Sequence, residues 1–142
     1  MAVHVALRLD VPNRPGELVK ALRPIATAGV NLHAVAGIAA SAEIRQSTET
    51  QANAIELLPS HVANAVDALQ QAGVQAHEVE VVVIWLPNRP GALLKACEAL
   101  AAAGLNLEGV YVISTDPIQG VQMTFECREA QRADQVLAAV RY

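Results

Sequence analysis

Two short turns carry the residues best suited to bind a small ligand: Asn13-Arg14-Pro15-Gly16 and Asn88-Arg89-Pro90-Gly91. Each follows an apolar segment with strand character and precedes a segment with the leucine spacing of a helix. We therefore expect free backbone N–H groups and the positive end of a helix dipole at each turn, which suits a carboxylate. The asparagine amide both donates and accepts hydrogen bonds, which suits a ligand carrying ammonium and carboxylate groups. Glycine lets such a ligand approach the backbone closely.

A second asparagine follows each turn, Asn31 in one case and Asn106 in the other. Each stands at the start of the next expected strand, and we expect its amide near the same end of the sheet as the turn. The candidate ligand-binding residues are Asn13, Arg14, Gly16, Asn31, Asn88, Arg89, Gly91 and Asn106.

The two halves of the chain are copies of each other. Residues 11–37 align with residues 86–112 without a gap, and each match recurs 75 positions later. Self-similarity over such a length indicates a duplication. The identical pairs outside the turns include Leu18/Leu93, Lys20/Lys95, Gly29/Gly104, Asn31/Asn106 and Leu32/Leu107.

Each copy shows the same series of elements. Alternating apolar residues over Val3–Leu9 predict a strand, and Pro15 is expected at the first helical position. The order βαββαβ is typical of a ferredoxin-like α+β unit, an antiparallel sheet with helices on one face. We thus predict two domains in tandem, over residues 1–77 and 78–142. The later elements of the first are a strand from Asn31, a turn over Ser41–Ser47, a strand over about Thr48–Leu58, a helix after Ser60 and a strand over Val74–Glu80.

The second copy is shorter than the first. The sequence ends at Tyr142, where the helix predicted over Ala130–Val140 ends, so the second unit lacks its last strand. In this fold the last strand lies beside the first, and an unpaired apolar edge invites association. We therefore expect Val79–Leu86 to be covered by a second copy, in a homodimer or a larger assembly.

Taken together, the turn, the leucine-rich helix and the following Gly-Val-Asn-Leu (Gly-Leu-Asn-Leu in the second copy) resemble the ACT domain. The resemblance covers the whole chain as two domains. It implies a regulatory module that binds an amino acid, commonly where two domains pack side by side. By this resemblance, Asn13, Gly16 and Asn31 contact the ligand, as do Asn88, Gly91 and Asn106, while the Arg-Pro pairs shape the turns.

The sequence departs from the family's pattern beside the turns. Serine-sensing relatives carry a histidine two residues before the first asparagine, where this chain has Val11 and Leu86. A serine-type site is therefore disfavoured, and an amino acid with an apolar side chain fits better. Glu17 would repel a ligand carboxylate whereas Ala92 would not, so we expect the second site to bind more strongly.

Composition excludes several classes of function. The formal net charge of −4 and a pI near 5.5 argue against nucleic-acid binding. No apolar run reaches the roughly 18–20 residues of a membrane span, and no signal peptide is apparent, so we expect a cytoplasmic protein. Cys97 and Cys127 have no metal or redox spacing, and the four histidines form no ligand pair. We expect no metal, no cofactor and no catalytic group.

The sequence therefore predicts a regulatory protein, not an enzyme, that senses or carries a free amino acid and changes its association with itself or a partner enzyme. The alternative is a structural or protein-interaction module with an empty pocket, which regulates a partner by association. A third alternative is a small ferredoxin-like enzyme such as an acylphosphatase, although the phosphate-cradling loop is missing.

Overall fold

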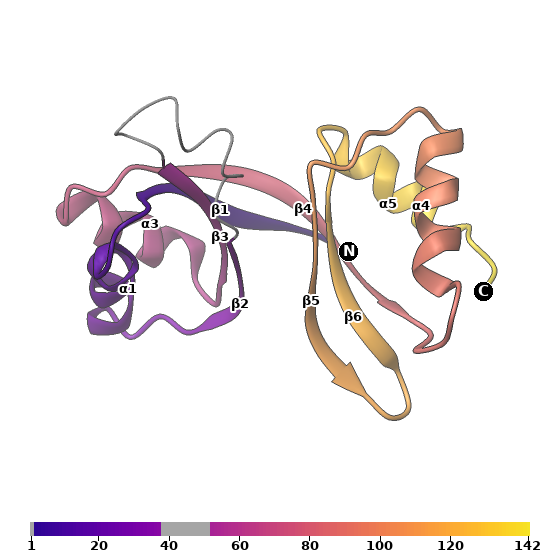
Figure 1. The fold of residues 1–142 in the computed structure, drawn as a ribbon, viewed down its shortest axis with the longest axis horizontal. Coiled ribbons are helices and arrows are strands. Elements are labelled where there is room, and N and C mark those ends of the chain that lie inside the picture. The colour runs from indigo at the N-terminus through magenta and orange to yellow at the C-terminus, as the bar shows by residue number, and fades with distance from the viewer. Residues whose placement is uncertain (1, 38–51) are drawn as a thin grey trace. The chain divides into compact units, whose positions relative to one another are not determined.

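The computed structural model describes residues 2–37 and 52–142, and it divides the chain into two compact units. The first unit comprises Ala6–Val79. The second comprises Glu80–Tyr142 together with the N-terminal residues up to Val5. In each unit, two helices lie on the same side of the strands (Figure 1). The predicted α+β class with two ferredoxin-like units is confirmed.

The first unit has the strand order β2-β3-β1-β4. Its antiparallel ladders pair β1 with β3 and β2 with β3. The third strand was expected over Thr48–Leu58, and its residues 48–51, like the turn expected over Ser41–Ser47, lie outside the described residues. The elements are β1 (Val3–Pro12), α1 (Glu17–Thr27), β2 (Leu32–Gly37), β3 (Ala52–Pro59), α3 (Val62–Gln71) and β4 (Ala76–Leu86).

The alternation in β1 builds the core of the first unit. Leu7, Leu9 and Val11 face one side of the strand and are buried, as the period of two predicts. Burying a side chain of this size stabilises the fold by about 1.5–3 kcal/mol. The helices complete the cluster with Ala21 and Ile25 from α1 and Ala65 and Leu69 from α3.

Both signature helices begin later than expected. Pro15 was predicted at the first helical position, but α1 starts at Glu17 and its N-cap is Gly16. The second copy behaves identically, with Gly91 as the N-cap of α4. Both glycines have left-handed backbones, at φ 86° and 87°, which other residues adopt only at a cost. The proline therefore lies in the turn and not in the helix, because the left-handed glycine stands between it and the first helical residue.

The second unit repeats this plan with the order β1-β4-β6-β5. β6 pairs antiparallel with both β4 and β5. Phe125, the largest fully buried side chain, lies in a cluster with Leu86, Leu100 and Leu137. The elements after β4 are α4 (Ala92–Ala102), β5 (Gly109–Asp116), β6 (Gly120–Glu126) and α5 (Ala130–Ala138). As predicted, no strand follows the last helix of this unit in the described sequence.

The expectation that β4 presents an open edge is wrong. The N-terminal residues lie in the position of the missing strand, and the Val83 N–H donates a hydrogen bond of 2.8 Å to the Ala2 carbonyl oxygen. Ala2 and Val3 also pack against the core of the second unit. The two compact units divide between Val79 and Glu80, and the residues up to Val5 belong with the second. Local patterns could not show that the first residues belong to the other unit, because this pairing joins segments about 80 residues apart.

A chain that begins at Ala6 should have a destabilised second unit. It loses the hydrogen bond to Val83 and the burial of Val3, together at least about 2 kcal/mol of unfolding free energy. The exposed edge of β4 should also promote association. Urea unfolding and size-exclusion chromatography measure both effects. His4→Ala, which removes only an exposed side chain and keeps the strand backbone, is the control. An unchanged urea midpoint in the truncated chain would contradict this assignment.

Candidate functional site

The two signature turns have the same backbone structure. In each turn the arginine N–H donates to the carbonyl of the residue before the asparagine. The N–H of the first helical residue donates to the arginine carbonyl, and the lysine N–H donates to the glycine carbonyl as the first bond of the helix. In the first unit these bonds are Arg14 N to Pro12 O (2.9 Å), Glu17 N to Arg14 O (3.3 Å) and Lys20 N to Gly16 O (3.2 Å). In the second they are Arg89 N to Pro87 O (2.9 Å), Ala92 N to Arg89 O (3.3 Å) and Lys95 N to Gly91 O (3.0 Å).

The candidate residues of both turns are exposed. Neither N-cap glycine can supply a side-chain hydrogen bond to the first turn of its helix. The first N–H groups of a helix lack intrahelical acceptors and carry partial positive charge. Each turn therefore presents an asparagine amide, an arginine and helix N–H groups at one surface, which suits a carboxylate.

The second asparagines lie at the other end of each unit, so the expectation of a shared end is wrong. Pro12 pairs with Ala52 at the start of β3, whereas Leu32, next to Asn31, pairs with Pro59 at its end. At roughly 3.3 Å per strand residue, this separates Asn13 from Asn31 by on the order of 20 Å.

The second unit repeats the separation. Leu86 pairs with Val121 at the start of β6, and the Glu108 N–H bonds to the Glu126 carbonyl oxygen at its end. In both units the chain runs along the strand and back through the helix before it reaches the second asparagine. One unit therefore cannot bring Asn88 and Asn106 to the same ligand.

Asn106 lies in a small hollow of about 300 Å³ that sequence reasoning missed. Glu108 and Arg128 share this hollow, and the arginine Nε donates to Glu108 Oε1 at 2.8 Å. The two residues stand 20 positions apart and no motif joins them, so only the pairing of β5 with β6 reveals the cluster.

Asn31 is held differently. Its N–H donates to Ser60 Oγ at 3.0 Å, and its carbonyl accepts the Ser60 N–H at 2.7 Å. The helix expected after Ser60 has His61 as its N-cap, and no side chain caps it. The serine hydroxyl therefore fixes the start of β2 instead.

Glu17 distinguishes the two turns electrostatically. Its Oε1 lies 3.3 Å from both Arg14 Nη2 and Lys20 Nζ, and its side chain is 15% exposed. The corresponding Ala92 is buried. Arg14 is thus already paired with an acid, which agrees with weaker ligand binding at the first turn than at the second. The difference in affinity itself remains a prediction.

The hairpin between β5 and β6 supports the second turn. Gly120 has φ 103°, and a Cβ there would overlap the Leu86 carbonyl oxygen and lie 3.2 Å from Asn88 N. Asp116 Oδ1 accepts the N–H groups of Ile118 and Gln119, both at 2.8 Å. These two hydrogen bonds hold the pKa of Asp116 below its usual value, and the bond from the Gln119 N–H has the larger effect. The hairpin is thereby fixed against the backbone that carries Asn88.

Metal binding, a reactive cysteine and a membrane-spanning helix were considered for residues 2–37 and 52–142. No group of three or more His, Cys, Asp or Glu side chains there could hold a metal ion. Burial raises the pKa of the Cys127 thiol, and the charges of Glu108 and Glu126 raise it further, so its sulfur is protonated at neutral pH. No helix in this part of the chain is long and apolar enough to cross a membrane.

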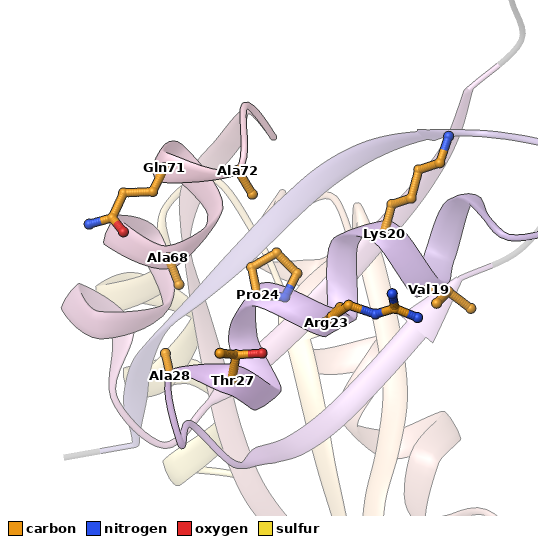
Figure 2. A pocket seen from close by; sticks show the side chains of 9 residues that line it. All are labelled: Val19, Lys20, Arg23, Pro24, Thr27, Ala28, Ala68, Gln71 and Ala72. Atoms are coloured by element: carbon orange, nitrogen blue, oxygen red, sulfur yellow. The ribbon is translucent and has the colours of Figure 1, made fainter.

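A larger hollow of about 650 Å³ lies between α1 and α3 (Figure 2). Its lining is mainly small and apolar, with Lys20, Arg23 and Gln71 as the long polar side chains. None of the eight candidate residues lines it.

Comparisons with known proteins agree with this structure. Residues 81–142 match the family model of the ACT domain. The comparison with curated proteins gave no match. The family match, which lies in the second unit, supports a ligand-binding regulatory role in general.

Solved structures share the fold of nearly the whole chain. Protein BT0572 from Bacteroides thetaiotaomicron is 23% identical with a TM-score of 0.78, covering 96% of this chain and 88% of that one. The ligand-free regulatory subunit of aspartate kinase from Thermus thermophilus is 19% identical with a TM-score of 0.66, covering 97% and 92%. The same subunit from Thermus flavus is 18% identical with a TM-score of 0.60, covering 97% and 95%.

Gly120→Ala should displace the Asn88 turn. The added Cβ meets the Leu86 backbone in a left-handed conformation, so we expect a loss of more than about 2 kcal/mol of stability. Gly104→Ala is the matched control, because φ is 72° there but nothing lies within 4 Å of the Cβ. It should cost only about 1 kcal/mol. Urea unfolding and the Asn88 amide shift report the result, and equal effects of the two substitutions would be inconsistent with the packing described.

Proposed function

We propose that this chain is a tandem ACT-type regulatory protein that binds a free amino acid and catalyses no reaction. The observation that carries the proposal is the signature turn. It occurs in both units with the same hydrogen bonds and the same left-handed glycine. Because the second unit contains the family match, the backbone identity of the turns supports an ACT domain in the first unit as well.

The two domains correspond to residues 1–77 and 78–142, with the first residues completing the second domain's sheet. The protein acts in the cytoplasm and needs no cofactor. Amino-acid binding changes its association with itself or with a partner enzyme.

The ligand lies between two copies of the chain. Within a unit the turn and the second asparagine are separated by on the order of 20 Å, which exceeds the length of an amino acid. A ligand that contacts both must take the turn from one unit and the asparagine from a different unit, which we assign to a second copy of the chain. With the asparagine supplied by a second copy, the site is complete only in a homodimer or a larger assembly, and this argument does not depend on an open strand edge.

Asn88, Arg89 and Gly91 form the stronger site together with Asn106 of a second copy. The absence of an acid at position 92 leaves the charge of Arg89 available for the ligand carboxylate. In the first turn Glu17 competes for Arg14. Leu86 is buried in the core and offers no polar group to the ligand, so an aliphatic side chain such as that of valine or leucine fits best.

An interaction module without a ligand is the second candidate. The pairing of Glu17 with Arg14 and Lys20 favours it, because this acid already occupies the cations of the first turn. Such a module would associate with a partner whether or not amino acids are present.

Calorimetry of the intact protein against the twenty amino acids tests the proposal. We expect an aliphatic amino acid to bind, and Asn88→Ala to weaken its affinity at least about tenfold through the lost hydrogen bonds to charged groups. Asn13→Ala, the same change in the first copy, should have a smaller effect. If no amino acid binds at millimolar concentration, sensing is excluded and the interaction module is the better description.

A further inference from the structure

The hollow of about 650 Å³ between α1 and α3, here called the helix groove, belongs entirely to the first unit. Its lining extends along α1 from Val19 to Ala28 and along the end of α3 from Ala68 to Ala72 (Figure 2). Most of these residues are exposed, so a segment of another protein can lie along the groove. At about 1.5 Å per helical residue the α1 wall is on the order of 13 Å long, which an extended peptide spans with about four residues.

The charged residues of the helix groove are cationic. Lys20 and Arg23 line it, and no described aspartate or glutamate does. Lys20 Nζ lies 3.3 Å from Glu17 Oε1 and is partly neutralised. Arg23 is exposed, and no described residue forms a hydrogen bond or ion pair with its side chain. In a chain with 14 acidic residues against 10 Lys and Arg, this available guanidinium in an acid-free groove is complementary to a carboxylate.

Pro24 adds a hydrogen-bond acceptor to the same wall. It lies inside α1 and has no N–H, so it cannot donate the helical hydrogen bond that the Lys20 carbonyl oxygen would otherwise accept. Residues four apart share one face of a helix, and both Lys20 and Pro24 line the groove. The Lys20 carbonyl oxygen can therefore accept a backbone N–H from an extended segment lying there.

The apolar part of the groove exists because α3 carries alanines there. Helices α3 and α5 align through the one buried leucine of each. On this alignment Val136 takes the position of Ala68, and it packs against the core of the second unit. Val140 takes the position of Ala72. The larger valine side chains occupy space that the alanines leave open.

The charge and the proline also differ between the copies. Glu98 takes the position of Arg23, and Ala99 that of Pro24. The alanines, the cation and the proline are thus combined in the first unit, and none of them is kept in the second. Because both units form the same helices, folding alone does not require this combination.

We propose that the helix groove is a docking site for an extended acidic segment of a partner protein. A carboxylate of the segment pairs with Arg23, and a backbone N–H donates to the Lys20 carbonyl oxygen. An aliphatic side chain of the segment lies against Ala68 and Ala72. None of the eight candidate ligand-binding residues lines the groove, so this docking does not depend on amino-acid binding.

Amide chemical-shift mapping on the intact protein tests the proposal with a capped tetrapeptide that alternates glutamate and leucine. It should shift the amides of Val19, Arg23 and Gln71. The same peptide with glutamine in place of glutamate should bind about threefold more weakly, as for a lost exposed ion pair, and a lysine version should not bind. The proposal is overturned if the glutamate peptide causes no shifts at millimolar concentration, if its shifts lie outside the groove, or if the lysine version binds equally well.

A titration of the protein without peptide tests the other possible occupant. The groove amides should keep their shifts as the protein is diluted. Shifts at Arg23 and Gln71 that follow protein concentration would assign the groove to a second copy of this chain and overturn the assignment to a partner.

Substitutions that install residues of the second unit locate the binding. Arg23→Glu should weaken binding of the glutamate peptide about tenfold or more, because it places like charges together. Arg141→Glu, at another exposed arginine, is the matched control and should change nothing. Pro24→Ala restores a helical N–H and should weaken binding about threefold, as for a lost neutral hydrogen bond.

Filling the groove gives an independent result. Ala68→Val combined with Ala72→Val should abolish peptide binding, whereas Ala63→Val, at an exposed position of α3 outside the groove, should not. Urea unfolding checks that each variant is folded. Full peptide binding by the double valine variant, by Arg23→Glu or by Pro24→Ala would refute the groove assignment. Calorimetry with amino acids is a separate readout, so failure here leaves the proposed function untouched.

Discussion

The hydrogen bond from the Val83 N–H to the Ala2 carbonyl oxygen marks the constraint on which the second unit depends. A ferredoxin-like sheet has a strand beside its first strand, and the described residues after α5 do not form one in the second unit. The N-terminal residues take that position, so β1 and β4 each contribute residues to both units. An edge that would otherwise invite association is paired within the chain.

The signature turns show how a duplicated backbone can be kept while its electrostatics change. Gly16 and Gly91 end their turns in the same left-handed conformation, and the hydrogen bonds around them differ by no more than 0.2 Å in length. Only the side chains differ, with Glu17 in one copy and Ala92 in the other. The first turn consequently carries an internal ion pair with Arg14, and the second does not have this acid.

The positions of the asparagines also restrict how such a protein can work. Each unit places one asparagine at the turn and the other at the far end of the sheet. A ligand with the length of an amino acid therefore cannot reach both asparagines of one unit.

Local patterns in the sequence determined much of this protein. The offset of 75 residues established the duplication, the alternation of Val3–Leu9 identified β1, and the Asn-x-Pro-Gly turns placed the candidate site. These features depend on neighbours in sequence, which is why they could be read directly. Three others required the tertiary structure: the N-terminal strand in the second unit, the separation of Asn13 from Asn31, and the cluster of Glu108 with Arg128. Each depends on strand pairings between segments distant in the chain, and no local periodicity encodes which strands will be neighbours.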